Sequence, residues 1–269
     1  MLTVSAVTAA FAELSLDLPE PTVLESTTST NSDALALAEA SAPAWTVVVA
    51  DFQTQGRGRL DRAWSAEPGK ALLFSVILRP PATIPAESIG WVPLLAGVAL
   101  SDMVKGLGVP AKLKWPNDLV IDGPSRDGSA GPRKLAGILA ERAGTAVVVG
   151  IGLNVSTGPD QLPVPAATSL TLEGADLVGR AGLLASTLAY LQIWWARFSE
   201  AKGNAAAAGI LQRYRRDCLS IGKQVRVALP GRDDVTGIVT DIDPDGRLLL
   251  QADSAALITI SAGDVVHMT

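Results

Sequence analysis

The 269-residue sequence predicts an α+β fold with a second, small β domain at its C-terminal end. Hydrophobic residues make up 48% of the chain and charged residues only 18%, which suffices for a substantial buried core. Up to about residue 219, apolar runs of strand length occur between segments of helical periodicity. From Gly222 onward, short β-rich runs alternate with turns, as in a small β-barrel. These three observations place the domains at 1–219 and 220–269.

Local patterns predict the elements of the larger domain in turn. The polar run 26–31 precedes an Ala- and Leu-rich segment, and Thr or Asn there is a helix N-cap signal. Residues 1–25 are acidic and contain proline, and they are too short for a DNA-reading domain, which needs roughly 60 residues. The expected helices are 32–41, 86–106, 176–202 and 204–219, and the expected strands are 45–52, 72–78, 112–115, 119–121, 134–141 and 146–155.

Composition excludes several classes of function. A net charge of −5 argues against a strongly basic nucleic-acid-binding protein. The single cysteine, Cys218, rules out an intramolecular disulfide and a cysteine-based zinc cluster. The single histidine, His267, rules out Ser-His-Asp catalysis, HExxH sites and three-histidine zinc sites. An enzyme of this composition works mainly with Lys, Arg, Asp, Asn, Gln and backbone groups.

No targeting or membrane segment is expected. The first basic residue is Arg57, whereas a secretory signal begins with a basic region and a transit peptide is rich in arginine. The most apolar segment, 181–196, is shorter than the roughly 20 residues of a membrane span and contains Ser, Thr and Gln. We interpret it as a core helix and expect a cytoplasmic protein.

A Gly- and Arg-rich segment, GRGRLDRAW at 56–64, is the first candidate for ligand binding. Glycine lets backbone N–H groups approach an anion, and arginine makes bidentate contacts with phosphate. The segment is not a Walker A loop, because no GK[ST] follows, nor a Rossmann fingerprint, because Asp61 stands at the third glycine position. Trp64 could stack on a base or on an arginine. The alternative is an exposed basic loop without a ligand.

Two further motifs carry polar residues next to strands. In KWPND at 114–118, Asn117 and Asp118 either bond their own turn or contact a ribose or a metal ion. In RKLAGILAE at 133–141, strand alternation puts Lys134, Ala136 and Ile138 on one face. Lys134 is then either solvated at the strand's start or directed into a cleft, where an anionic ligand would stabilise its ammonium group.

Paired glycines mark the end of another apolar strand, GIGLN at 150–154. Glycine weakens a strand, so Gly150 and Gly152 indicate either close approach of a ligand or a bulge. Together the motifs point to an anionic, nucleotide-like ligand beside a small apolar one. No side chain is a convincing covalent nucleophile, which leaves positioning and electrostatic stabilisation as the catalytic resources.

The sequence resembles the biotin–protein ligases. The matching pieces, in family order, are Ser29-Thr30-Asn31, Gln53 with GRGR and Trp64, KWPND, RKLAGIL, GIGLN, and the C-terminal turn 261–264. The resemblance runs from about residue 25 to the end, and it is to a form without the family's optional N-terminal DNA-binding domain. It implies a mixed β-sheet flanked by helices, like class II aminoacyl-tRNA synthetase catalytic domains, followed by an SH3-like β-barrel.

The resemblance also implies a reaction. Biotin and ATP, with Mg²⁺ as the activating ion, give biotinyl-5′-AMP and pyrophosphate. A lysine of a biotin carboxyl carrier domain, in an acyl-CoA or pyruvate carboxylase, then takes the biotinyl group and releases AMP. Biotin is a substrate here, and no tightly bound prosthetic group is implied. DNA and membrane partners are not expected, whereas a homodimer is compatible with the resemblance.

Site residues also follow from the resemblance. Lys134 and Arg59 are the catalytic candidates, and the metal ligands stay unassigned, although Asp118 is a candidate for Mg²⁺ or the ribose. The biotin-binding candidates are Ser29, Thr30, Asn31, Gln53, Gly56, Arg57, Gly58, Arg59, Lys134 and Gly137. The nucleotide-binding candidates are Arg57, Arg59, Arg62, Trp64, Asn117, Asp118, Lys134 and Asn154.

The sequence departs from the family pattern at two places. Asp61 stands where the family usually has glycine, and 123–132 lengthens the connection between KWPND and RKLAGIL. Because 123–132 is almost entirely Gly, Pro, Ser and Asp, we expect a mobile surface loop.

The rival functions are those of a lipoate– or octanoate–protein ligase and of a non-enzymatic biotin sensor or DNA-binding regulator. The base that deprotonates the acceptor lysine is not identified.

Overall fold

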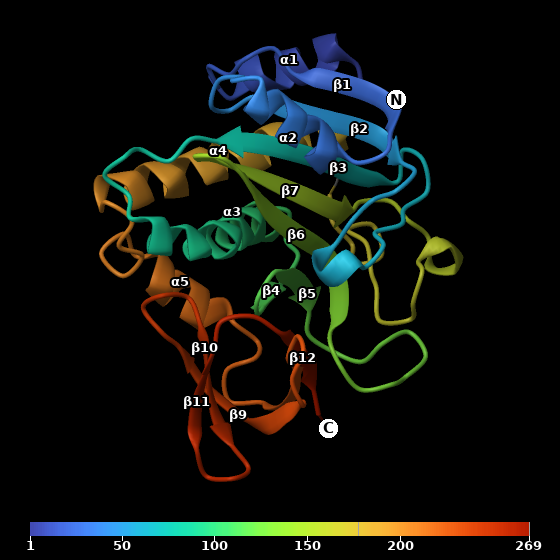
Figure 1. Ribbon diagram of the computed structural model, residues 1–269. Coiled ribbons are helices and arrows are strands. Elements are labelled where there is room, and N and C mark those ends of the chain that lie inside the picture. Colours follow the sequence, from blue (N-terminus) through green and yellow to red (C-terminus); the bar gives the residue numbers. More distant parts are fainter. Residues whose placement is uncertain (177, 269) are drawn as a thin grey trace.

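A computed structural model describes residues 1–176 and 178–268, without the side chain of Asp61. Its larger part is a seven-stranded sheet in the order β1-β2-β3-β7-β6-β5-β4, parallel between β1 and β2 and antiparallel elsewhere (Figure 1). The expectation of a mixed sheet flanked by helices is confirmed. The strands are β1 (Thr22–Thr27), β2 (Val47–Gln53), β3 (Ala71–Leu78), β4 (Ala111–Lys114), β5 (Asp118–Ile121), β6 (Arg133–Ala143) and β7 (Ala146–Asn154).

Helices cover both faces of this sheet. On one face, α2 packs through Ala34 and Ala38 against Val48 of β2 and Val148 of β7. The opposite face carries the main core, where α3 and α4 lie side by side and α1 packs on α4. The helices are α1 (Val4–Glu13), α2 (Thr30–Glu39), α3 (Val92–Gly106), α4 (Gly179–Glu200) and α5 (Ile210–Asp217), with short 3₁₀ turns η1 (Arg59–Asp61), η2 (Ala86–Trp91) and η3 (Pro159–Gln161).

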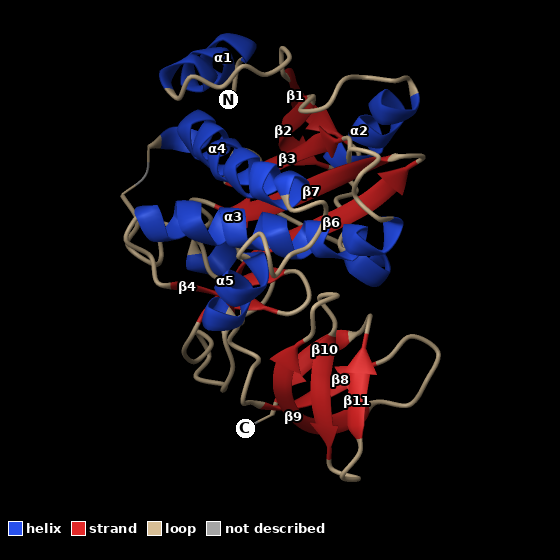
Figure 2. Cartoon of the chain, turned by 90° about the vertical axis from the view of Figure 1, so that its left-hand side faces the viewer, coloured by secondary structure: helices blue, strands red, loops and turns tan. Residues whose placement is uncertain are grey.

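The C-terminal residues form a separate five-stranded antiparallel sheet in the order β11-β10-β9-β8-β12 (Figure 2). Inward residues such as Val225, Val227 and Leu250 alternate with exposed ones, which is the pattern of a sheet with one buried face. All five β-rich runs of the sequence become strands. They are β8 (Gln224–Ala228), β9 (Val235–Ile242), β10 (Leu248–Ala252), β11 (Leu257–Ile260) and β12 (Asp264–His267).

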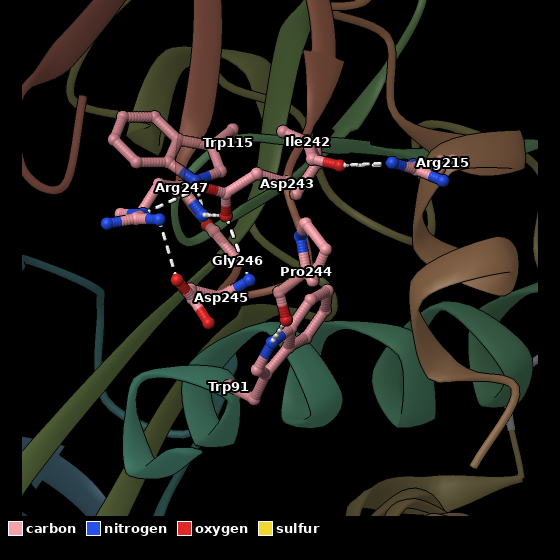
Figure 3. A network of polar contacts seen from close by, with 9 residues as sticks. All are labelled: Trp91, Trp115, Arg215, Ile242, Asp243, Pro244, Asp245, Gly246 and Arg247. Atoms are coloured by element: carbon pink, nitrogen blue, oxygen red, sulfur yellow. Dashed lines mark hydrogen bonds and ion pairs between the residues drawn. The ribbon is translucent and has the colours of Figure 1, made fainter. Parts of the chain in front are cut away.

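Tryptophan side chains dock the small sheet onto the large domain (Figure 3). Trp91 Nε1 donates to the carbonyl of Pro244 at 2.7 Å, and Trp115 Nε1 donates to that of Gly246 at 2.9 Å. Arg215 of α5 donates to the carbonyl of Ile242 at 2.7 Å. All three carbonyls belong to the end of β9 or to the β9–β10 turn, so this turn is held at fixed points beside KWPND.

Two local expectations differ from the structure, and the loop 123–132 makes contacts that the sequence did not predict. The N-terminal residues contain α1 and β1, which gain their stability from packing on α4 and pairing with β2 rather than from local pattern. The helix expected at 204–219 covers only α5, because Gly209 has a φ of +76° and ends the preceding turns. The loop 123–132 is tied to the rest of the protein through Ser125, which is buried, and Arg126, which bonds the carbonyls of Val164 and Ala167.

One helical stretch of the described residues, 86–106, is long and apolar enough to cross a membrane by length and composition alone. Since 67% of that window is buried inside the protein, the stretch has the environment of a core helix. The segment 181–196 lies within α4, whose residues Leu184, Leu188 and Leu191 are fully buried, so its interpretation as a core helix is confirmed.

Candidate functional site

The Gly- and Arg-rich segment between β2 and β3 folds into a narrow hairpin. The N–H of Trp64 donates to the carbonyl of Gly56 at 2.8 Å, and the N–H of Gly58 donates to that of Arg62 at 2.7 Å. At the tip, Leu60 has a φ of +52°, a conformation that L residues adopt only at a cost. The hairpin thereby places Arg59 and Trp64 over the α2 face of the sheet.

Beneath this hairpin lies a cavity of about 140 Å³, bounded by α2, β2, β5, β6, β7 and one residue of the small domain. Most residues that the sequence singled out line it. They are Ser29, Thr30, Asn31, Gln53, Arg57, Gly58, Arg59, Arg62, Trp64, Asn117, Asp118, Lys134, Gly137, Gly150 and Gly152.

Two candidates lie outside the lining. Asn154 is buried, and its Nδ2 donates to the carbonyl of Thr168 at 2.9 Å, so its amide nitrogen holds the chain rather than facing the cavity. Gly56 lies behind the hairpin, where a Cβ would be 2.4 Å from the carbonyl oxygen of Trp64. Glycine at this position therefore allows the hairpin to close.

One end of the cavity is a buried polar network at the start of α2. The N–H and the hydroxyl of Thr30 donate to Gln53 Oε1 at 2.8 and 3.1 Å, which leaves the Nε2 group of Gln53 as a donor for a ligand. Ser29 is the N-cap of α2, but its hydroxyl makes no capping bond. Ser29 and Gln53 thus present free polar groups to the cavity, and the buried Trp64 Nε1 also has no hydrogen-bond partner there.

Asn31 has a structural part in this network. Its Nδ2 donates to the Leu139 carbonyl at 3.3 Å and to Glu141 Oε2 at 2.7 Å, and its Oδ1 accepts from Ser75 at 2.6 Å. Both amide hydrogens are therefore engaged within the protein. Sequence reasoning missed Ser75 and Glu141. Ser75 had a visible signal, since it is the single polar residue in the apolar run ALLFSVIL.

Three glycines form the floor of the cavity. Gly137 and Gly152 face each other across β6 and β7, and the Trp64 ring lies so close that a Cβ on Gly152 would be 2.5 Å from it. A Cβ on Gly150 would be 2.1 Å from Asn31 Oδ1. Pairing of β7 is regular through these positions, so close approach rather than a bulge explains both β7 glycines.

A bulge does occur in β6, at the start of RKLAGIL. Leu119 pairs with Ala136 and Val120 with Lys134, so Leu135 is an extra residue. The expectation that Lys134 shares a face with Ala136 is wrong, because the bulge turns Lys134 onto the face of Gly137. A Cβ on Gly137 would lie 3.3 Å from Lys134 Nζ.

Charged groups surround the middle of the cavity. Lys134 Nζ pairs with Asp118 Oδ1 at 2.7 Å and lies 5.6 Å from the centre of the Trp64 ring. Arg62 pairs with Asp264, a residue of the small domain that sequence reasoning placed only in a turn. Arg59 Nη1 donates to Asn117 Oδ1 at 3.4 Å. These cations exceed the two acids in number, which favours an anionic ligand.

Burial affects the neighbouring basic groups. It lowers the pKa of the Arg59 guanidinium, against the opposing attraction of Asp264 and Asp118. It also lowers the pKa of Lys114, which sits opposite Asp118 at the end of β4. Desolvated cations of this kind gain the most from an anion that replaces their lost water. Lys114 is thus a buried basic neighbour of Asp118, although it does not line the cavity.

The described residues contain no group of three or more His, Cys, Asp and Glu side chains suited to a metal ion. Asp118 and Asp264 are the carboxylates that line the cavity, and both are paired with basic groups. Magnesium usually keeps several waters and binds through one or two carboxylates plus substrate phosphates. The residues present therefore fit an ion that enters with a nucleotide.

Other proteins share this sequence and fold. The profile of the Biotin/lipoate A/B protein ligase family matches residues 22–157, and that of the Biotin protein ligase C terminal domain matches 220–268. The chain is 40% identical to the biotin--[acetyl-CoA-carboxylase] ligase of Mycobacterium tuberculosis over 91% of this chain and 88% of that protein. It is 37% identical to the bifunctional ligase/repressor BirA of Bacillus subtilis, over 58% of this chain and 47% of that protein.

Among solved structures, the biotin protein ligase from Aquifex aeolicus in complex with biotin and ATP superposes with a TM-score of 0.73 at 25% identity. The match covers 92% of this chain and 98% of that one, so it includes both sheets.

Proposed function

The chain belongs to the biotin/lipoate A/B protein ligase family, and we propose that it is a biotin–protein ligase that forms biotinyl-5′-AMP from biotin and ATP. It then transfers the biotinyl group to a lysine of a biotin carboxyl carrier domain. The observation that carries this proposal is the position of Lys134. Its ammonium group lies between Asp118 and the Trp64 ring, in the lining of the cavity and above the glycines on which that ring packs.

Adenylation joins two anions. A carboxylate oxygen of biotin attacks the α-phosphorus of ATP, the bond to the β-phosphate oxygen breaks, and pyrophosphate leaves with its electron pair. The obstacle is repulsion, which fixed cations in a partly dry site reduce at the point where charge develops. Lys134 and Arg59 are the catalytic candidates, and Arg57 and Arg62 complete the cationic wall of the hairpin.

The buried network at the start of α2 suits the cyclic urea of biotin. Gln53 Nε2 and the Ser29 hydroxyl are available, whereas Thr30 holds Gln53 in place and Asn31 serves as a support. Gly58 and Gly137 leave space for the ligand's chain. A urea oxygen and its two N–H groups need donors and an acceptor, and these hydroxyl and amide groups supply both.

The nucleotide belongs on the other side of Lys134. Trp64 offers a ring for stacking, Asn117 and Asp118 lie at the KWPND turn, and Arg62 reaches across to Asp264. We assign Mg²⁺ to the nucleotide as part of the substrate, near Asp118. Asn154 acts on this side indirectly, through the Thr168 carbonyl.

In the second step, the neutral amine of the acceptor lysine attacks the acyl carbonyl carbon. The C–O bond to AMP breaks, and the amine gives up a proton as the amide forms. AMP departs as a stable anion, which explains how a site without histidine suffices. The names of the relatives point to a carboxylase carrier domain, of acetyl-CoA carboxylase in the first instance and of other acyl-CoA or pyruvate carboxylases by extension.

Finer assignments complete the proposal. We assign the large domain, 1–219, to the class II aminoacyl-tRNA synthetase-like type, which its antiparallel strands β3 to β7 support, and the small domain, 220–269, to the SH3-like type. We also propose a cytoplasmic location without DNA or membrane partners, and a homodimer as the assembly to test first.

The decisive test is incubation of the purified chain with ATP, Mg²⁺, labelled biotin and a carboxyl carrier domain. We expect covalent label on the carrier and pyrophosphate release that depends on biotin. Excess lipoate or octanoate should not compete, and effective competition would favour a lipoate-type ligase instead. Tight biotin binding without pyrophosphate release would indicate a sensor.

A further inference from the structure

Lys134 is held by its backbone as well as by Asp118. β7 leaves the edge of β6 after Asn154, and the segment 166–168 takes its place beside Lys134. The N–H of Lys134 donates to the Ala166 carbonyl at 2.7 Å, and the carbonyl of Lys134 accepts from the N–H of Thr168 at 2.8 Å. Segment 166–168 thus determines how the Lys134 peptide is oriented at the bulge.

A half-buried carboxylate closes a ring around this peptide. Glu173 binds Arg133 through two parallel bonds, from Nε at 3.1 Å and from Nη2 at 3.0 Å. Its Oε1 also accepts from the hydroxyl of Thr168 at 2.6 Å. Arg133 precedes Lys134 in the chain, so Glu173 links the residue before Lys134 to the residue that bonds its carbonyl.

This ring is shielded and braced. Side-chain exposure is 19% for Arg133 and 13% for Glu173, and Thr168 is 2% exposed, so water competes little for these bonds. Arg126, in the loop 123–132, bonds the carbonyls of Val164 and Ala167 from the outside. The ring reaches the cavity through the backbone of Lys134, and its other neighbour, Asn154, which donates to the Thr168 carbonyl, lies outside the cavity lining.

We propose that Glu173 is a positioning residue for Lys134, fixing the direction in which the ammonium group enters the cavity by holding Arg133 and Thr168 on either side of its peptide. The inference rests on the proposed adenylation reaction, in which Lys134 stands between the two anions. A displacement of about 1 Å of a catalytic group can cost about a hundredfold in rate. Arg126 supports the same arrangement through segment 164–167.

The experiment measures biotin-dependent pyrophosphate release and, separately, transfer from supplied biotinyl-AMP. We expect Glu173→Ala to lower kcat and kcat/KM for adenylation together by about tenfold, because the lost positioning matters in the transition state. Transfer should change by less than about twofold, since its acyl phosphate is already formed. Glu173→Gln keeps one acceptor oxygen, which can serve Arg133 Nε and the Thr168 hydroxyl but turns an N–H group towards Arg133 Nη2, so it should restore only part of the adenylation rate.

Asp102→Asn is the matched control. Asp102 is also a half-buried carboxylate bound to an arginine, Arg213, with a second donor from Trp194 Nε1 at 2.8 Å. It lies on α3, away from the cavity lining. We expect a similar fall in Tm from Asp102→Asn and Glu173→Ala, but a loss of adenylation only from the latter. Equal adenylation in the two variants would overturn the positioning role.

A double-mutant cycle tests whether Glu173 acts through Lys134. In a Lys134→Ala background, Glu173→Ala should cost no further rate beyond about twofold, because the side chain that it positions is absent. If the rate losses of Lys134→Ala and Glu173→Ala multiply in the double variant, Glu173 acts independently of Lys134 and the proposal is overturned. If Glu173→Ala does not fold, Thr168→Val, which removes the hydroxyl that donates to Glu173, takes its place in the cycle. If the wild-type chain forms no biotinyl-AMP, both the proposed function and this inference are overturned. If the wild type is active and the Glu173 variants do not behave as expected, only this inference is overturned.

Discussion

Replacement of Lys134 by alanine is the sharpest test of the assigned chemistry. The ammonium group lies 2.7 Å from Asp118 Oδ1, and its removal leaves that carboxylate unneutralised beside two incoming anions. At 4 Å, a pair of unit charges is worth about 4 kcal/mol near a protein surface. Because the Lys134 side chain is 38% exposed, solvent screens part of this attraction. We therefore take the smallest free-energy cost seen for a lost oxyanion contact, about 2.7 kcal/mol or a hundredfold in rate.

The assay follows pyrophosphate release with saturating biotin and ATP, and then transfer from chemically supplied biotinyl-AMP. We expect Lys134→Ala to fold and to adenylate at least about a hundredfold more slowly, with a smaller loss in transfer. Lys134→Arg should rescue only partly, because a planar fork does not replace a compact charge. Lys105→Ala, which breaks the Lys105–Asp217 pair between α3 and α5, serves as the control. Adenylation by Lys134→Ala within about threefold of wild type would refute the assignment.

Four further outcomes are expected. Biotin plus ATP should slow proteolysis within 57–62, since the hairpin shields the adenylate from water, and equal cleavage with and without ligands would contradict this. Gly152→Ala should fold but lose ligand-dependent protection of the hairpin, because its Cβ would be 2.5 Å from Trp64, and retained protection would argue against this packing. Burial lowers the pKa of His267 to about 4, whereas a histidine in the unfolded chain has a pKa near 6.5. The contribution of His267 to the free energy of unfolding should therefore be fully present above about pH 6.5 and be lost as the pH falls towards 4. His267→Gln should reduce the pH dependence of the free energy of unfolding between about pH 4 and 6.5, as measured by denaturation at several pH values. An unchanged slope would exclude His267 as the cause of that dependence. Replacing 127–130 with two glycines while keeping Arg126 should leave adenylation within about twofold, and a larger loss would reveal a role for the loop tip.

The sequence allowed most strands and the cluster of motifs to be anticipated, because their patterns are local. Buried runs such as 72–78 became strands within a residue of their expected ends. The elements that were missed depend on distant partners. β1 is a half-buried edge strand that pairs with β2, and α1 lies on α4, so neither has a strong pattern of its own. Helix propensity likewise could not reveal the break at Gly209.

Candidate side chains were predicted more reliably than their orientation. Alternation along β6 assigned Lys134 to the wrong face, because a single extra residue, Leu135, reverses the order and leaves no mark in the sequence. Asn31 and Asn154 were candidates through the resemblance, and their amide nitrogens prove to be engaged within the protein. A motif shows which chemical groups are present, whereas the number of free donors depends on partners such as Ser75 and Glu141 from other strands.

Positioning by distant residues explains how a site without histidine or cysteine performs two reactions. Its cations act by their charge, so the rate depends on where they are held. Lys134 is fixed by the β6 bulge, by segment 166–168 and by Asp118, and Arg62 is fixed by Asp264 of the small domain. Asp264 belongs to β12, and the small domain that carries it is docked through the β9–β10 turn by Trp91 and Trp115. It follows that substitutions at such supports should impair adenylation more than ligand binding, which kcat and KM measured separately will distinguish.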